Sequence, residues 1–222
     1  ERYRFFSNVC REYGYEGVIL GHHRGDQAET VLKRIFEGAS LLKISGMPSY
    51  SERDGLKIFR PLLSLAKKEI FDYLEIIGAK PFEDPTNRDT HYLRARMRER
   101  VIPLIASEFG KEIEGNLSFL SDEVNELRRY FDEKLNGFLK EIKPIAGGYS
   151  LDLQKGNHHS PYEVKLLIKG FCEKMGITLS REQIDTFLGY YSSHATGKPL
   201  YINGHRLTME RGVLRKIAVD VE

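Results

Sequence analysis

The stretch from Gly17 to Thr30 constrains the fold more than any other part of the chain. Its apolar run Val18-Ile19-Leu20, bounded by glycines, is typical of a buried parallel strand. The polar run His22-His23-Arg24-Gly25 follows at once, and apolar residues then recur at helical spacing from Ala28 to Phe36. A strand that feeds a helix through a polar loop indicates an α/β sheet, and ligands bind such sheets at the carboxyl ends of the strands.

Two acidic residues in the first turn of this predicted helix are candidate site residues. Asp26 and Glu29 lie three positions apart, so both side chains can face one crevice. Helix capping is one interpretation, because acidic side chains are favoured in a first helical turn. Metal ligation by His22, His23 and these acids is another, although adjacent histidines on an extended loop tend to point apart.

A second cluster lies on a predicted helix between His91 and Pro103, where the region from position 88 to 100 holds five arginines. An apolar stripe through Leu93, Met97, Val101 and Leu104 would place Arg94 beside the buried face and Arg96 opposite it. Arg98 and Arg100 would flank the stripe. An arginine beside a buried face needs an anionic partner, either a protein carboxylate or a phosphate.

The remaining pattern predicts two domains in 222 residues. A helix over residues 1–13 precedes the central strand, a further strand covers 56–63, and a long helix runs from Phe109 to about Lys143. After the break at Pro144, two helices and an antiparallel unit with an Asn203-Gly204 turn predict a small α+β domain. We therefore expect domains at 1–108 and 147–222, joined by a bridging segment at 109–146.

Composition indicates a cytoplasmic protein without a membrane span. No apolar run is long enough to span a bilayer. The net charge of +2 does not by itself indicate a nucleic-acid partner. Cys10 and Cys172 both lie in apolar helical patterns, so we expect buried free thiols and no disulfide.

His22-His23-Arg24-Gly25-Asp26-Gln27-Ala28-Glu29-Thr30 resembles the H-H-x-x-D-Q-A-E-T signature of tRNA(Ile)-lysidine synthetases, which are PP-loop ATP pyrophosphatases. Further similar segments are R-Y-x-F-F at residues 2–6, G-M-P at 46–48, R-P-L-L at 60–63 and D-P-T-N at 84–87. The family's R-N-x-x-R motif matches Arg94 and Arg98, but Ala95 replaces the usual asparagine and Gly25 replaces a common aspartate. The resemblance implies a partial doubly wound parallel sheet of the adenine nucleotide alpha hydrolase-like kind.

The resemblance also implies a reaction, in which ATP with Mg²⁺ adenylates the wobble cytidine of tRNA(Ile) and free L-lysine then replaces AMP. It places Arg2, His22 and His23 at the nucleotide, and Asp26, Glu29, Arg94 and Arg98 at the substrate. Asp26, Glu29 and Arg94 would be catalytic, and Arg96, Arg98 and Arg100 would contact tRNA. The C-terminal domain would bind tRNA, and the chain could pair as a homodimer.

The S-G-G-x-D-S phosphate loop of PP-loop enzymes does not occur in this sequence. We expect that an N-terminal portion is missing and that these residues alone are inactive. Two other functions stay open at this point. One is another PP-loop tRNA-modifying activity such as thiolation, which needs reactive cysteines, and the other is a non-catalytic RNA-binding module.

Overall fold

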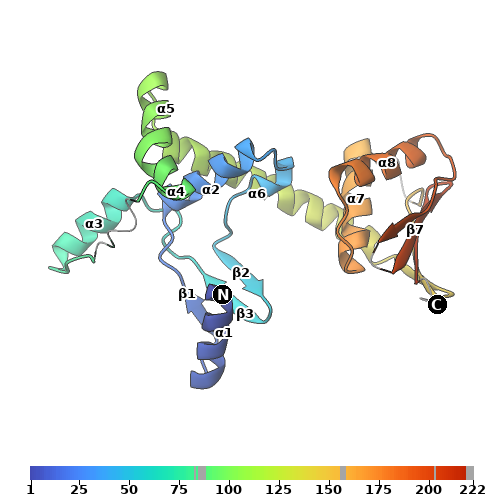
Figure 1. Cartoon of the computed structure of the whole chain (residues 1–222), viewed down its shortest axis with the longest axis horizontal. Helices are drawn as coiled ribbons and strands as arrows, with labels where there is room; N and C mark the ends of the chain where they lie inside the picture. The colour runs from blue at the N-terminus through green and yellow to red at the C-terminus, as the bar shows by residue number, and fades with distance from the viewer. Residues whose placement is uncertain (83, 85–88, 156–158, 203, 219–222) are drawn as a thin grey trace. The chain divides into compact units, whose positions relative to one another are not determined.

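The computed structural model describes residues 1–82, 84, 89–155, 159–202 and 204–218. Within it the chain divides into two compact units, Glu1–Arg128 and Arg129–Glu222 (Figure 1). The division falls inside one long helix, and each unit has its own hydrophobic core. The two units are therefore described separately.

The first unit contains a three-stranded sheet in the order β1-β3-β2. β1 (Gly17–Ile19) pairs in parallel with β3 (Leu56–Phe59), and β2 (Tyr50–Arg53) pairs antiparallel to β3. Helix α1 (Arg2–Tyr13) packs on this sheet through Cys10 (Figure 1). The α/β prediction is confirmed, whereas β2 is a strand that the sequence analysis did not predict.

The burial expected for the strand β1 is wrong in part, and helix α1 is buried on one face only. Ile19 is 75% exposed, and Phe5 and Tyr13 on α1 are each 63% exposed. β1 is an edge strand of this sheet and α1 covers one of its faces, so the side chains that point away from this contact stay open. The apolar run identifies the strand but does not tell which of its faces is covered.

Helices form the rest of the first unit. They are α2 (Arg24–Phe36), the short 3-10 helix η1 (Leu41–Lys43), α3 (Lys67–Ile76), α4 (Leu93–Arg96), the π-helical turn η3 (Met97–Val101) and α5 (Ile102–Phe109). Ala28 and Leu32 of α2 pack against Met97 and Ile102, and this contact joins α2 to the arginine-bearing helix.

The long helix α6 spans Ile113–Leu139, shorter at both ends than predicted. Gly110 ends α5 in a left-handed conformation with φ 60, so Phe109 belongs to the preceding helix. The compact units divide between Arg128 and Arg129, so the last turns of α6 belong with the second unit.

The second unit is an α+β arrangement with a five-stranded antiparallel sheet in the order β4-β5-β8-β7-β6. Its elements are β4 (Lys143–Ile145), β5 (Gly148–Asp152), α7 (Pro161–Lys174), α8 (Arg181–Ser192), β6 (Leu200–Ile202), β7 (His205–Glu210) and β8 (Val213–Ala218). Pro144 lies in the edge strand β4, where its missing N–H is tolerated. The predicted hairpin forms between β6 and β7, although Asn203 lies outside the described residues.

Both cysteines are buried and free, as predicted. In the described part of the chain, none of the helices has the length and apolar character required to cross a bilayer.

Candidate functional site

The loop after β1 enters α2 through a histidine cap. His23 has extended backbone, its Nδ1 accepts a hydrogen bond from the Gly25 N–H at 3.0 Å, and its own N–H donates to Asp26 Oδ2 at 3.0 Å. This reciprocal pair satisfies two amides at the start of the helix. Capping was one interpretation of Asp26, and the structure assigns the other half of the cap to His23.

Arg98 joins the two predicted acids. Its Nη2 lies 2.6 Å from Glu29 Oε1 and 3.2 Å from Asp26 Oδ1, and its Nε donates to Glu29 Oε1 at 2.7 Å. A forked guanidinium suits such a bridge between two carboxylates. Residues that are 69 and 72 positions apart in the sequence therefore form one ionic cluster.

Glu29 is the most deeply buried member of this cluster, at 1% exposure. Burial raises the pKa of its carboxyl, and the hydrogen bond and charge of Arg98 oppose this only in part. Its second oxygen, Oε2, is buried and accepts no hydrogen bond from any described residue. A buried carboxylate oxygen without a donor is ready to accept a bond from a cationic ligand.

The π-helical turn η3 contains the arginine that reaches the acids. The predicted apolar stripe is wrong in part, because Leu93 is 46% and Leu104 is 60% exposed, whereas Met97 is buried and Val101 packs against the same core. Ala95, which the stripe did not include, is also buried. Arg98 is the second residue of η3, directly after Met97, and contacts both acids.

Arg94 is exposed and acts on the cluster through its charge. Burial is the largest cause of the raised pKa of Glu29 and of the lowered pKa of His22, and the charge of Arg94 opposes the first shift slightly and adds slightly to the second. Arg96 and Arg100 turn back toward the start of the same segment. Arg96 donates to the carbonyls of Thr90 and His91 at 3.2 and 2.7 Å, and Arg100 lies 3.3 Å from Thr90 Oγ1. The D-P-T-N segment lies mostly outside the described residues.

His22 stands in a positively charged environment. Burial lowers its pKa, Asp26 opposes this, and the charges of Arg60, Arg2 and Arg94 lower it further. Its Nδ1 is buried and has no hydrogen-bond partner within the described part of the chain. The loop therefore places a neutral imidazole among several guanidinium groups.

Sequence reasoning did not single out Arg60, which follows β3 and is only 6% exposed. Its Nη1 donates to the Pro48 carbonyl at 2.9 Å and to Ser51 Oγ at 3.1 Å. The only available signal was its place in the R-P-L-L segment at the carboxyl end of a strand.

Gln27 organises the loop that faces α2. Its side chain accepts from the Met47 N–H at 2.7 Å and donates to the Met47 carbonyl at 3.0 Å and to Ser121 Oγ at 2.9 Å. Gly46 has φ +65, and a Cβ there would lie 2.6 Å from the Gln27 carboxamide. The D-Q-A-E-T segment therefore supplies the two acids of the candidate site and also holds the neighbouring loop through Gln27.

Residues 1–105 match the family model described as the PP-loop domain. Over 213 residues the chain is 35% identical to the tRNA(Ile)-lysidine synthase of Chlamydia muridarum, covering 96% of this chain and 66% of the relative. The synthase of Chlamydia abortus is 33% identical over 213 residues, which are 96% of this chain and 67% of the relative. The chain belongs to the tRNA(Ile)-lysidine synthase family.

A further member of the family, from Protochlamydia amoebophila, is 36% identical over 184 residues, which cover 82% of this chain and 40% of the relative. The chain spans about two thirds of the length of the Chlamydia relatives that it matches. Membership confirms the resemblance of the H-H-x-x-D-Q-A-E-T segment, and the PP-loop match supports an adenine nucleotide alpha hydrolase-like fold for the first unit.

Two positions depart from the family's pattern, and the structure gives each a local reason. A Cβ at Gly25 would lie 2.9 Å from His23 Cε1, so this glycine lets the histidine ring lie close over the loop. Ala95 is 6% exposed and lies two residues before Met97, which belongs to the core between α2 and η3. A small apolar side chain fits this buried position without needing a hydrogen-bond partner.

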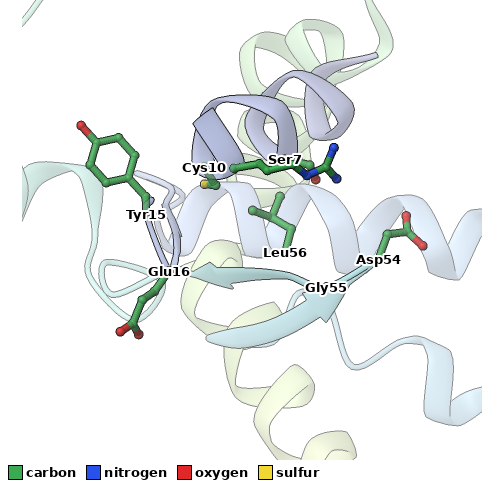
Figure 2. A pocket seen from close by; sticks show the side chains of 8 residues that line it. Ser7, Cys10, Tyr15, Glu16, Asp54, Gly55 and Leu56 are labelled. Atoms are coloured by element: carbon green, nitrogen blue, oxygen red, sulfur yellow. The ribbon is translucent and has the colours of Figure 1, made fainter. Parts of the chain in front are cut away.

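A separate hollow of about 290 Å³ opens between α1 and the β2–β3 turn. Figure 2 shows Cys10, Tyr15, Glu16, Asp54 and Leu56 around it. Its lining includes none of the candidate site residues, so this hollow is distinct from the Asp26–Glu29–Arg98 cluster. In the described ranges of the chain, no group of three or more His, Cys, Asp and Glu side chains could hold a metal ion.

Proposed function

We propose that this chain carries the lysine-binding part of an enzyme that ligates lysine to C2 of the wobble cytidine of tRNA(Ile), the CAU-anticodon tRNA. The observation that carries the proposal is the Glu29 carboxylate. It is buried, it is fixed by Arg98 through one oxygen, and its other oxygen has no partner among the residues that the structure describes. Family membership supports a tRNA substrate, since the relatives are named tRNA(Ile)-lysidine synthases.

The acid pair suits the ammonium group of lysine. Glu29 Oε2 would accept one N–H of this group, and the neighbouring carboxylate of Asp26 would add a second negative charge. Arg98 balances part of the negative charge of Asp26 and Glu29 and holds both carboxylates in position. Because the site is largely closed to water, each interaction with a cation is stronger than it would be at an exposed surface.

The chemistry proceeds in two balanced steps. The C2 oxygen of cytidine attacks the α-phosphorus of ATP, the bond between the α- and β-phosphates breaks, and pyrophosphate leaves. The lysine ε-amine, after losing one proton, then attacks C2, and the C2–O bond breaks with release of AMP. The free ε-amine is mostly protonated near neutral pH, so a carboxylate that accepts this proton lowers the barrier to attack.

The arginines divide between these steps in the proposal. Arg94 and Arg2 face the charge that develops on the adenylate, together with His22 and His23 at the nucleotide. ATP enters with its Mg²⁺ as a substrate complex. Arg96, Arg98 and Arg100 provide positive charge along the side from which tRNA would approach.

The thiolation alternative gains no support from the cysteines. Burial raises the pKa of Cys172 to about 12, which keeps its thiol protonated and unreactive. The Cys10 thiol donates to the Gly17 carbonyl at 3.6 Å beneath α1.

The test is lysine transfer by the whole protein carrying Asp26→Asn or Glu29→Gln. We expect lysine incorporation to fall at least about tenfold in each variant, because each loses a charged acceptor for the ammonium. Glu112→Gln is the matched control, since Glu112 also accepts from a backbone amide at a helix start, that of Gly115. Normal incorporation by the folded Asp26 and Glu29 variants would reduce these acids to structural roles and would refute the proposal.

A further inference from the structure

Glu114 of α6 brings a further carboxylate to the start of α2. Its Oε2 lies 3.3 Å from the position that a Cβ would occupy at Gly25, a buried residue in the first turn of α2. The residue before it, Ile113, packs against the apolar cluster that includes Ala28 of α2. The first turn of α6 is therefore fixed against α2, and it supplies a carboxylate at a position where α2 itself has only a glycine.

The Glu114 carboxylate is not used by the neighbouring protein groups. It forms no hydrogen bond or ion pair with another residue in the described ranges of the chain. The Gly115 N–H at the start of α6 donates instead to Glu112 Oε2, at 2.6 Å. Glu114 is partly buried, and a partly buried carboxylate without a partner favours the approach of a cation.

Glu114 and Glu29 lie along the same side of α2. Gly25 and Glu29 are four residues apart in this helix, so their side-chain positions face the same way and are about one turn, or about 5.4 Å, apart along the axis. Glu29 is 1% exposed, and its Oε2 has no partner among the described residues. Through its contact with Gly25, Glu114 therefore places a second available carboxylate about one turn before Glu29.

We propose that Glu114 binds the α-ammonium group of the amino-acid substrate, whose ε-ammonium group is bound by Glu29 and Asp26. Free L-lysine carries both groups in protonated form near neutral pH, at the two ends of a flexible four-carbon stem. Such a stem spans a distance similar to one helical turn. A ligand with a single ammonium group can occupy only one of the two carboxylate positions, so Glu114 contributes to the selection of a diamino acid.

This inference rests on the proposed function, because it concerns the same lysine site. The test compares two ligands, L-lysine and ε-aminocaproate, which are titrated separately into the whole protein by calorimetry. ε-Aminocaproate has the carboxylate, the carbon chain and the terminal amine of lysine but lacks the α-ammonium group. The contributions of the shared groups therefore cancel, and we expect the wild-type protein to bind lysine about tenfold more tightly than ε-aminocaproate.

The decisive variant is Glu114→Gln, which keeps the shape of the side chain and removes its charge. It should weaken lysine binding about tenfold and leave ε-aminocaproate binding within about twofold, because only lysine has a group that reaches this carboxylate. Glu112→Gln is the matched control, since it removes an acid from the same helix start, and it should leave both affinities within about twofold. Glu114→Asp keeps the charge on a shorter side chain and should retain part of the preference for lysine.

Three results would overturn the inference. They are equal affinity of the wild-type protein for the two ligands, an equal change or no change for both ligands in the folded Glu114→Gln variant, and the same loss of preference in Glu112→Gln. If Glu114→Gln fails to fold, the wild-type comparison and Glu114→Asp decide the question.

Glu29→Gln, measured with the same two ligands, separates this inference from the proposed function. It should weaken the binding of both ligands, since both carry the terminal ammonium group. If Glu29→Gln weakens neither, the proposed function fails. If it weakens both while Glu114→Gln changes neither, the inference about Glu114 fails alone.

Discussion

Glu29 is the residue on which the proposed lysine site depends most, because its carboxylate is held in an unfavourable environment. Its carboxylate is buried beside Asp26, and only one of its oxygens is bonded, to Arg98. Burial disfavours the charged form of the carboxylate, so a bound cation would lower the free energy of the charged cluster. This difference is what would give the site affinity for an ammonium group.

The raised pKa of Glu29 predicts the pH dependence of lysine binding. Glu29 must lose its proton before its carboxylate can accept hydrogen bonds from an ammonium group. As the pH decreases, lysine affinity should therefore begin to fall at a higher pH than it would with a glutamate of ordinary pKa. Calorimetric titration of lysine between about pH 5 and pH 8 measures this. Affinity that stays constant down to the ordinary glutamate range would contradict the prediction.

The same shift has a consequence for stability with a definite sign. The folded chain binds the Glu29 proton more tightly than the unfolded chain, so the ionised group lowers stability as pH rises through its folded pKa. Glu29→Gln should therefore lose less stability than the wild type as the pH rises from the ordinary glutamate pKa through the raised pKa of Glu29 in the folded chain. Urea unfolding of both proteins at several pH values provides the comparison.

Arg94 and Arg96 are predicted to differ in function although they are two residues apart. Arg94 acts electrostatically on Glu29 and His22, so Arg94→Ala should lower the rate of lysine transfer more than tRNA affinity. Arg96→Ala should weaken tRNA binding modestly and reduce the salt slope by about 1 if it contacts one phosphate. Single-turnover transfer and tRNA binding across a salt series separate the two effects. Loss of affinity alone in Arg94→Ala would remove this residue from the reacting centre.

At the scale of elements, two local irregularities carry the site. The π-helical turn η3 contains Arg98, which contacts the acids of α2, and Gln27 of the same helix forms hydrogen bonds with the loop around Gly46. Ala28 and Leu32 of α2 pack on Met97 and Ile102, so the ion cluster lies beside a shared apolar contact. A rigid contact of this kind keeps charged groups at fixed distances.

Gly46→Ala tests how tightly the loop fits α2. The substitution should cost about 1–2 kcal/mol from the left-handed backbone alone, and more because its Cβ would lie 2.6 Å from the Gln27 carboxamide. Gly38→Ala is the matched control, since Gly38 has φ +67 but nothing within 4 Å of its Cβ position. Chemical denaturation of both variants isolates the contact, and equal losses would mean that Gln27 can move aside.

At the scale of the whole molecule, each compact unit has its own hydrophobic core and its own salt bridges. In the second unit, Lys134 Nζ on α6 lies 2.5 Å from Glu163 Oε1 at the start of α7. The same carboxylate accepts the Ser160 N–H at 2.7 Å in a capping box. The bond from Lys134, followed by those from Ser160, lowers the pKa of Glu163 to about 2.

Glu163 should therefore make the second unit sensitive to acid. The folded pKa lies below the ordinary value of 4.5, so the stabilisation is present above that value and is lost as pH falls toward about 2. Glu163→Gln should lower the unfolding temperature of this unit at neutral pH and flatten its pH dependence. Glu173→Gln, which removes an exposed partner of Lys169 at 3.7 Å, should change little. Lysine binding through the first unit is the internal control and should not change.

Local sequence determined most of the elements and the chemical character of the site. The alternation of apolar runs, glycines and caps was sufficient for α1, β1, α2 and the β6–β7 hairpin, because these depend on contacts between near neighbours. The H-H-x-x-D-Q-A-E-T segment identified Asp26 and Glu29 as candidates, and its resemblance pointed to the family that the comparisons confirm.

Tertiary structure alone decided which groups meet. Regular helical spacing placed Arg94 beside the buried face, whereas the packing of Met97 on α2 holds the neighbouring Arg98 at the acids. Arg60 gave no periodic signal, because its hydrogen-bond partners Pro48 and Ser51 lie on another segment. The period of a helix or strand indicates the direction in which a side chain points from that element. Which residue the side chain then contacts depends on how distant segments of the chain pack.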